Sequence, residues 1–321
     1  MSTEGSAGTG GTENVTDAGS RGSVENVTNA ESSAGSAGAA RELSGRGLAT
    51  AIRTDATERA AALAARGRPA RLAVVTATDD EASAWYVRSI VNAARKVGIE
   101  CEVADLGPGA EAGEIRDRLE ALSADEWVSG IILQTPLPKG TKLEDLASAI
   151  VPAKDVDGAN PLSLGRLAAG LPAFAPATAE AVVRLLDHHG VPLAGRHAVV
   201  VGRSTVVGKP AAHLLLDRDA TVTVCHSRTA DLAAVTSAAD VLVAAVGRIG
   251  LVTPDHVRPG AVVVDVGTNQ TEDGGLAGDV DPAVAARASA LTPVPGGVGP
   301  VTTALLLAHT VQAAETLTEG R

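Results

Sequence analysis

The stretch whose residue types most plainly suggest chemistry is "VVVGRSTVVGKPAAHLLL", residues 199–216. Its apolar start predicts a buried strand, Gly202 opens a turn, and a helix is expected to begin near Gly208. Amides at a helix N-terminus face a bound phosphate, and the helix dipole favours its negative charge. The glycine spacing differs from G-x-G-x-x-G, so a plain tight turn stays an alternative to a dinucleotide-binding loop.

The end of the next apolar run bears on which dinucleotide would bind. A fold that binds NAD usually carries an acidic residue there for the ribose 2′-hydroxyl, whereas this run ends in Cys-His-Ser-Arg, residues 225–228. Ser227, Arg228 and, from the first turn, Arg203 could instead bind a 2′-phosphate. The residues therefore favour NADP over NAD, although a solvated loop arginine is the plain alternative for Arg228.

A second candidate lies in "SAWYVRSI", residues 83–90, which holds the only tyrosine of a chain with 1% aromatic residues. On a helix, Tyr86 and Ile90 share a face about one turn apart. Val87, Ile90, Val91 and Ala94 also follow the spacing of a core-facing stripe, so plain packing is one interpretation of Ile90.

The elements that must position these residues alternate between short apolar runs and helical patterns, which predicts an α/β fold with mainly parallel sheets. Strands are expected at 71–77, 100–106 and 128–134, with helices at about 83–96 and 111–122. A helix near 178–189 precedes further strands at 197–202, 220–226, 239–246 and 261–267. Residues 136–167 are predicted to be mostly loop, and a helix is expected after 292–300.

This order predicts two three-layer α/β domains, the second of them Rossmann-like and NADP-binding. We place the first domain at 41–180 plus 300–321 and the NADP-binding domain at 181–299. Residues 1–40 contain almost no large apolar side chain, so we expect a disordered low-complexity tail.

Composition narrows the class of partner. A net charge of -11 argues against nucleic acid and anionic membranes as partners and favours small molecules. No apolar run reaches the length of a membrane span, and the N-terminus does not resemble a signal peptide, so a cytoplasmic location is expected. The two cysteines and seven histidines form no cluster with metal-ligand spacing, and no metal is expected.

Taken together, the motifs resemble those of the bifunctional methylenetetrahydrofolate dehydrogenase/cyclohydrolase family. The matching stretches occur in the family's order over nearly everything after residue 41. They are "YV" at 86–87, "GIILQTPLP" at 130–138, "PAKDVDG" at 152–158, "GRSTVVGKP" at 202–210, "CHSRT" at 225–229, "DVGTN" at 265–269, "GDVD" at 278–281 and "TPVPGGVGP" at 292–300.

This resemblance implies oxidation of 5,10-methylenetetrahydrofolate with NADP, a cleft between two domains and a homodimer. In bifunctional members the methenyl product is then hydrolysed to 10-formyltetrahydrofolate. The resemblance assigns pterin stacking to Tyr86, support of the family's catalytic lysine to Gln134 and pterin binding to Asp157, and these three are the catalytic candidates, within the first, folate-binding domain. The cofactor-binding candidates are Gly202, Arg203, Ser204, Gly208, Ser227, Arg228 and Thr268, and the further substrate-binding candidates are Pro295, Gly296 and Gly297.

The family places a lysine, its general acid/base, four residues after the tyrosine, and this chain has Ile90 there. Hydrolysis needs a group that takes a proton from water and returns one to a ring nitrogen, which isoleucine cannot do. Hydride transfer depends more on orientation, because the cofactor takes the electrons. We therefore hypothesise a dehydrogenase with weak or absent cyclohydrolase activity.

Other departures concern the same region: "TDDEAS" at 78–83, "APAT" at 175–178 and Val301. They keep three alternatives open. The chain could be a full bifunctional enzyme, an oxidoreductase with an altered substrate, or a protein that only binds folate or NADP. The intact phosphate-facing motifs favour an enzyme over a binding-only protein.

Overall fold

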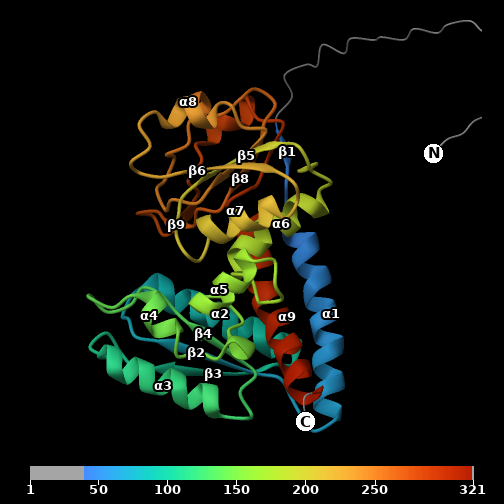
Figure 1. The fold of residues 1–321 in the computed structure, drawn as a ribbon, viewed down its shortest axis with the longest axis vertical. Coiled ribbons are helices and arrows are strands. Elements are labelled where there is room, and N and C mark those ends of the chain that lie inside the picture. Colours follow the sequence, from blue (N-terminus) through green and yellow to red (C-terminus); the bar gives the residue numbers. More distant parts are fainter. Residues whose placement is uncertain (1–39, 320–321) are drawn as a thin grey trace, which may run out of the picture. The chain divides into compact units, whose positions relative to one another are not determined.

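The computed structural model of the protein describes residues 40–319. Within this range the strands form a three-stranded sheet, a six-stranded sheet and a short two-stranded hairpin, with helices between them (Figure 1). The predicted α/β fold class is confirmed. The tail predicted to be disordered, residues 1–40, lies outside the described residues apart from Ala40.

The three-stranded sheet is parallel and has the order β3-β2-β4. Its strands are β2 (Arg71–Thr76), β3 (Glu100–Asp105) and β4 (Gly130–Leu133), and helices α2 (Glu81–Val97) and α3 (Ala112–Ala124) connect them. Residues 72–75 and 130–133 are buried, as near-continuous apolar runs in a covered parallel sheet should be. The predicted strands and helices of this part are all present.

Helix α2, which carries Tyr86, has a defined start and end. The Asp80 carboxylate accepts a hydrogen bond from the Ser83 N–H at 2.7 Å, and Gly98 ends the helix in the left-handed region at φ 82°. Val87, Ile90 and Ala94 are buried, which fixes the rotation of the helix about its axis. Val91, predicted on the same stripe, is only partly buried.

The six-stranded sheet is parallel throughout and has the order β1-β11-β8-β7-β5-β6. Its strands are β1 (Arg41–Glu42), β5 (His197–Val201), β6 (Thr221–Cys225), β7 (Val241–Ala244), β8 (Val262–Asp265) and β11 (Ala290–Leu291). Helices α6 (Ala177–His188), α7 (Gly208–Leu216) and α8 (Leu232–Thr236) belong to this part of the chain. The four longer strands match the predicted ones.

The carboxyl ends of the central strands meet at one edge of this sheet. Val201 pairs with Cys225 on one side and with Ala244 on the other, and Ala244 pairs with Asp265. The chain runs from β5 to its neighbour β6 and then returns to β7 on the opposite side of β5. Such a switch in strand order is where open α/β sheets bind their ligands.

Helices α1 (Arg46–Ala65) and α9 (Val298–Glu319) pack along one another (Figure 1). One cluster of buried apolar side chains includes Val74 of β2, Leu306 of α9 and Val200 of β5, so α9 packs in the same core as both sheets. The final helix was expected, whereas α1 was not assigned individually.

Residues 136–167, predicted to be mostly loop, hold more helix than expected. They contain α4 (Leu143–Ala147), a 3-10 turn at Pro152–Lys154 and α5 (Pro161–Ala168), where Pro161 occupies the first helical position and Asn160 caps it. Proline at that position favours a helix start instead of preventing one. The remaining elements are 3-10 turns at Pro254–His256 and Pro282–Ala286 and the hairpin β9 (Asn269–Gln270) and β10 (Leu276–Ala277).

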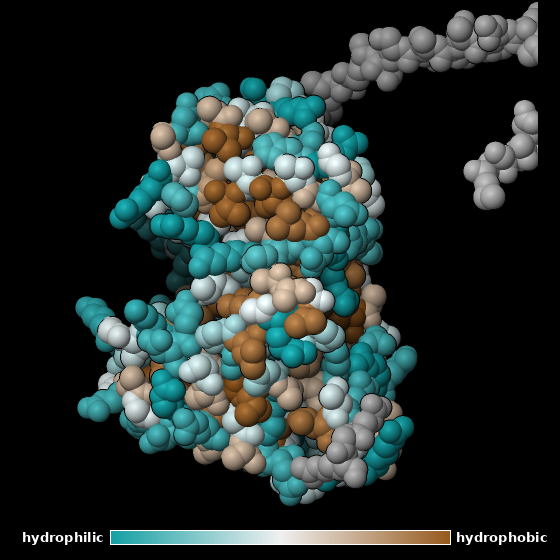
Figure 2. Space-filling model, in the orientation of Figure 1, coloured by the Kyte–Doolittle hydropathy of each residue, from teal (hydrophilic) through white to brown (hydrophobic). Residues whose placement is uncertain are grey.

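Hydrophilic side chains cover much of the face drawn in Figure 2, with smaller hydrophobic patches between them. None of the helices within residues 40–319 combines the length and apolar character needed to cross a bilayer.

Candidate active site

The loop after β5 approaches other backbone too closely for side chains at its two glycines. Gly202 has φ +129°, and a Cβ atom on it would lie 2.2 Å from the carbonyl oxygen of Ala245. A Cβ on Gly208 would lie 2.2 Å from the carbonyl oxygen of Gly202. Both positions therefore require glycine. At Gly208, the first residue of α7, the missing side chain lets the start of the helix lie close to the turn.

Ser204 organises this turn from within. Its Oγ accepts the N–H groups of Val207 at 3.2 Å and Gly208 at 3.4 Å, so it caps the start of α7. The Thr205 hydroxyl donates to Glu144 Oε1 of α4 at 2.8 Å. A backbone hydrogen bond of Glu144 itself is the main cause that lowers the pKa of its carboxyl group. The bond from Thr205 and the nearby charge of Lys209 lower this pKa further. The loop after β5 thus contacts α4, which follows the three-stranded sheet along the chain.

The cationic candidates Arg203 and Arg228 are exposed and follow the adjacent strands β5 and β6. The turn after β6 is held from inside, because His226 Nδ1 accepts the Arg228 N–H at 3.1 Å and the His226 N–H donates to Thr229 Oγ1 at 2.9 Å. Ser227 is likewise exposed. The structure thus brings the three candidates for the 2′-phosphate to one edge of the sheet.

Thr268, the last cofactor candidate, is exposed just beyond β8 at the same edge. A network of buried carboxylates fixes its loop: Asp265 accepts the N–H groups of Gly267 and Asp279, and Asp279 accepts those of residues 246–248. Burial raises the pKa of Asp265, although the hydrogen bonds from the N–H groups of Asp279 and Gly267 oppose the rise.

Tyr86 and Asp157 lie close enough for the charge of Asp157 to act on the Tyr86 hydroxyl. The Thr303 side chain of α9 lies near that hydroxyl, and the Ala177 N–H at the start of α6 lies near the Asp157 carboxyl group. Burial raises the pKa of Tyr86, and the charge of Asp157 raises it further. Burial and then the neighbouring Asp155 raise the pKa of Asp157 to about 7. An aromatic ring thus lies beside a carboxyl group that titrates near neutrality.

Gln134 follows β4 and is bonded locally. Its Nε2 donates to the carbonyl oxygen of Thr135 at 2.8 Å, and the Ser83 hydroxyl of α2 donates to the same oxygen at 3.2 Å. The glutamine is therefore connected to α2 through a shared acceptor.

Ile90 is fully buried and packs in the main apolar cluster with Val87, Ala94 and Val97. Its geometry is that of the core-facing stripe. No titratable side chain replaces the family's lysine at this position, although Tyr86, one turn earlier, lies beside Asp157.

The loop that holds Pro295, Gly296 and Gly297 lies between β11 and α9. Gly296 has φ +120°, and its carbonyl oxygen accepts the Gly45 N–H at 2.9 Å just before α1. A Cβ on Gly297 would lie 2.8 Å from the Pro293 carbonyl oxygen. Pro295 is exposed, whereas both glycines are buried.

Sequence reasoning missed Thr303, the Ala177 N–H and His309, which all contribute to the surroundings of Tyr86 and Asp157. "APAT" at 175–178 and the helix after "GGVGP" were noted, but their distance from Asp157 along the chain hid these contacts.

The fold and the site define a two-part α/β enzyme with a nucleotide-binding sheet. The family model for the tetrahydrofolate dehydrogenase/cyclohydrolase catalytic domain matches residues 43–157, and the model for the NAD(P)-binding domain of the same family matches residues 176–318. The chain belongs to the tetrahydrofolate dehydrogenase/cyclohydrolase family.

Relatives and solved structures agree with this assignment. The chain is 66% identical over 277 residues to "Bifunctional protein FolD 1" of Saccharopolyspora erythraea, covering 86% of this chain and 94% of that protein. The FolD bifunctional enzyme of Campylobacter jejuni has a TM-score of 0.83 at 39% identity, with 87% of this chain and 99% of that chain covered. The Trypanosoma brucei dehydrogenase-cyclohydrolase, solved with NADP and an inhibitor, has a TM-score of 0.82 at 36% identity, with 87% and 98% covered.

Proposed function

We propose that this protein oxidises 5,10-methylenetetrahydrofolate to 5,10-methenyltetrahydrofolate with NADP. The observation that carries the proposal is the loop after β5. It has no room for side chains at Gly202 and Gly208, and the exposed Arg203 and Arg228 lie at the same edge of the sheet. Family membership supplies the folate chemistry. When bound, the nicotinamide accepts a hydride from the methylene carbon, and the protein's task is to hold the two reactants in position.

Tyr86 and Asp157 are proposed to bind the pterin. The tyrosine ring offers an aromatic face, and an ionised carboxylate accepts two hydrogen bonds from the N–H donors of a pterin edge. Gln134 and the loop of Pro295, Gly296 and Gly297 complete the proposed substrate site. Ser204, Ser227 and Thr268 complete the proposed cofactor site with the two glycines and two arginines above.

The two domains proposed are residues 41–180 plus 300–321 and residues 181–299. A homodimer, which the family resemblance implies, and a cytoplasmic location are also proposed.

The cyclohydrolase step is the point on which residues and relatives differ. The similar proteins named above are called bifunctional, which favours the alternative in which this chain also hydrolyses the methenyl compound. Against it stands Ile90, which cannot move a proton and is buried in the core. We propose that dehydrogenation is the principal activity and that ring opening is weak, and full bifunctionality is the second candidate.

A direct test incubates the purified full-length chain with methylenetetrahydrofolate and NADP and follows NADPH formation, with NAD and a folate-free reaction as comparisons. NADPH that forms faster than reduced NAD supports the proposal. Tight NADP binding without turnover of this substrate would support an oxidoreductase with a different substrate. Binding of neither NADP nor tetrahydrofolate in a thermal-shift assay would contradict the enzyme assignment.

The preference for NADP is expected to depend on the two loop arginines. Charge-assisted hydrogen bonds to a phosphate contribute about 1.5–3 kcal/mol each, so Arg228→Ala should raise the Kd for NADP by about tenfold to a hundredfold. The Kd for NAD, which lacks the 2′-phosphate, should remain within about twofold. Calorimetric titration with both nucleotides measures the difference.

Arg196→Ala is the matched control, because Arg196 is exposed before the amino end of β5, at the opposite edge of the sheet. It should change neither Kd. Equal losses of NADP and NAD affinity in Arg228→Ala would show that the arginine does not read the 2′-phosphate.

A further inference from the structure

His309 of α9 lies between two hydrogen-bond acceptors behind the pterin site. Its Nδ1 is 2.8 Å from the carbonyl oxygen of Val156, and its Nε2 is 3.0 Å from Glu180 Oε2 of α6. The ring is 5% exposed and packs against Phe174 with 5.1 Å between ring centroids. It is therefore held on three sides.

The partners of this ring are both hydrogen-bond acceptors. A carbonyl oxygen only accepts hydrogen bonds, so Nδ1 must carry a hydrogen. Burial opposes ionisation of Glu180, but His309 and Arg184 outweigh it and lower the pKa of Glu180, which therefore also acts as an acceptor. Arg184 Nε lies 2.9 Å from the other oxygen of Glu180. Both ring nitrogens of His309 therefore face an acceptor, the Val156 carbonyl on one side and the Glu180 carboxylate on the other.

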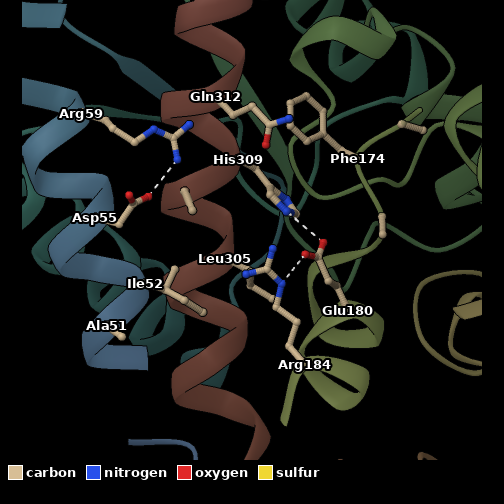
Figure 3. A pocket seen from close by; sticks show the side chains of 13 residues that line it. Ala51, Ile52, Asp55, Arg59, Phe174, Glu180, Arg184, Leu305, His309 and Gln312 are labelled. Atoms are coloured by element: carbon tan, nitrogen blue, oxygen red, sulfur yellow. Dashed lines mark hydrogen bonds and ion pairs between the residues drawn. The ribbon is translucent and has the colours of Figure 1, made fainter. Parts of the chain in front are cut away.

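Figure 3 shows this arrangement on one wall of a groove. His309 and Arg184 both point to the Glu180 carboxylate, while Arg59 and Asp55 of α1 pair on the opposite wall. Arg59 also binds Glu315 of α9 at 2.6 Å. The pairs on the α1 wall are separate from the His309 contacts and offer a matched control.

The bond to the Val156 carbonyl places the His309 imidazole next to two carboxyl groups, Asp155 and Asp157. Asp155 accepts the N–H groups of Ala159 at 2.9 Å and Asn160 at 3.0 Å, whereas the only backbone group that lowers the pKa of Asp157 is the Ala177 N–H. Asp157 thus depends more on its electrostatic surroundings. The charge of His309 lowers the pKa of both carboxyl groups.

We propose that His309, fixed by Glu180, is a positioning residue that holds the 155–157 segment and thereby sets the position and electrostatic surroundings of the Asp157 carboxyl group. That the ionised carboxylate serves to bind a pterin rests on the proposed function. His309 is not one of the residues proposed to contact the pterin or the cofactor, and it acts only through Asp157.

The direction of the pH dependence follows from the raised pKa of Asp157, about 7. Protonation as the pH falls through this value removes the carboxylate and weakens pterin binding. Folding stability changes in the opposite direction, because a carboxyl with a raised pKa favours the folded state below its unfolded pKa and loses that contribution as the pH rises through 7. The charged and titratable groups around Asp157 are Asp155, Tyr86, His309 and, through His309, Glu180 and Arg184.

The decisive experiment measures the titration of Asp157 directly by NMR of carboxyl carbons in protein labelled at aspartate, with Asp157→Asn to assign the signal. In His309→Asn the Asp157 pKa should rise by about 1 unit, the scale of losing one nearby opposite charge. At pH 7 such a shift lowers the ionised fraction from about one half to about one tenth, so the Kd for tetrahydrofolate should rise about fivefold. Glu180→Gln should shift the pKa in the same direction.

Glu315→Gln is the control, because it breaks an ion pair on the same helix without touching the 155–157 segment. It should leave the Asp157 titration unchanged even if it lowers the melting temperature. An unchanged Asp157 pKa in folded His309→Asn and Glu180→Gln would overturn the inference. If the wild-type protein bound no tetrahydrofolate, the proposed function would fail, while the NMR titration would still decide whether His309 controls the charge of Asp157.

Discussion

Replacing Ile90 by lysine is expected to increase the rate of methenyltetrahydrofolate ring opening by about a hundredfold or more, the usual contribution of a positioned general acid/base. The site already contains Tyr86 one turn earlier on α2 and Asp157 beside it. A lysine in the buried space of Ile90 loses hydration, which lowers its pKa toward neutrality and suits it to take a proton from water. The rate of ring opening is measured for each purified variant as the loss of the absorbance of methenyltetrahydrofolate.

Ile90→Met is the control for this prediction, because the methionine side chain is unbranched and long like that of lysine but has no titratable group. The lysine variant should also melt at a lower temperature, since a charge replaces a fully buried apolar side chain. A folded Ile90→Lys protein that opens the ring no faster than Ile90→Met would show that Ile90 is not what limits the hydrolysis.

Replacing Gly208 by alanine is expected to weaken NADP binding by about a hundredfold or more. The added Cβ would lie 2.2 Å from the carbonyl oxygen of Gly202 and 2.8 Å from the Arg203 nitrogen, and both are backbone atoms. The turn must then open, which displaces the amides at the start of α7 that are proposed to bind the pyrophosphate. Titration of the folded variant with NADP and with NAD measures the loss, which should be similar for both nucleotides.

Gly299→Ala provides the comparison, because Gly299 lies in α9 and a Cβ there meets nothing within 4 Å. That variant should keep its affinity for both nucleotides. An unaffected NADP affinity in Gly208→Ala would exclude this loop as the pyrophosphate site.

The strands and longer helices could be predicted because each carries its pattern locally. The runs at 197–202 and 239–246 are apolar on both faces and form β5 and β7, and the stripe of Val87, Ile90 and Ala94 orients α2. Helix α1 was harder to recognise, because alanine, threonine and arginine are spread around it without a strong apolar stripe. The two-residue strands β1 and β11 form only by pairing with each other and β8, which leaves no local signal.

Much of the candidate site could be located from motifs, while its electrostatics could not. Gly202 directly follows β5 and Gly208 begins α7, so their place in a strand-turn-helix unit was predictable. The Tyr86–Thr303 proximity and the His309–Glu180 hydrogen bond involve residues 217 and 129 positions apart, and they exist only because α9 packs beside α2 and α6. The burial that raises the pKa of Asp157 is likewise a property of the folded chain.

We propose that the protein is an NADP-dependent methylenetetrahydrofolate dehydrogenase in which Ile90 leaves ring opening slow. The most direct test mixes enzyme, methylenetetrahydrofolate and NADP and follows NADPH and the methenyl compound at two wavelengths in one reaction. Equal accumulation of both products is the predicted result. NADPH formation without accumulation of the methenyl compound would contradict it, because another group would then supply the proton transfer that Ile90 cannot.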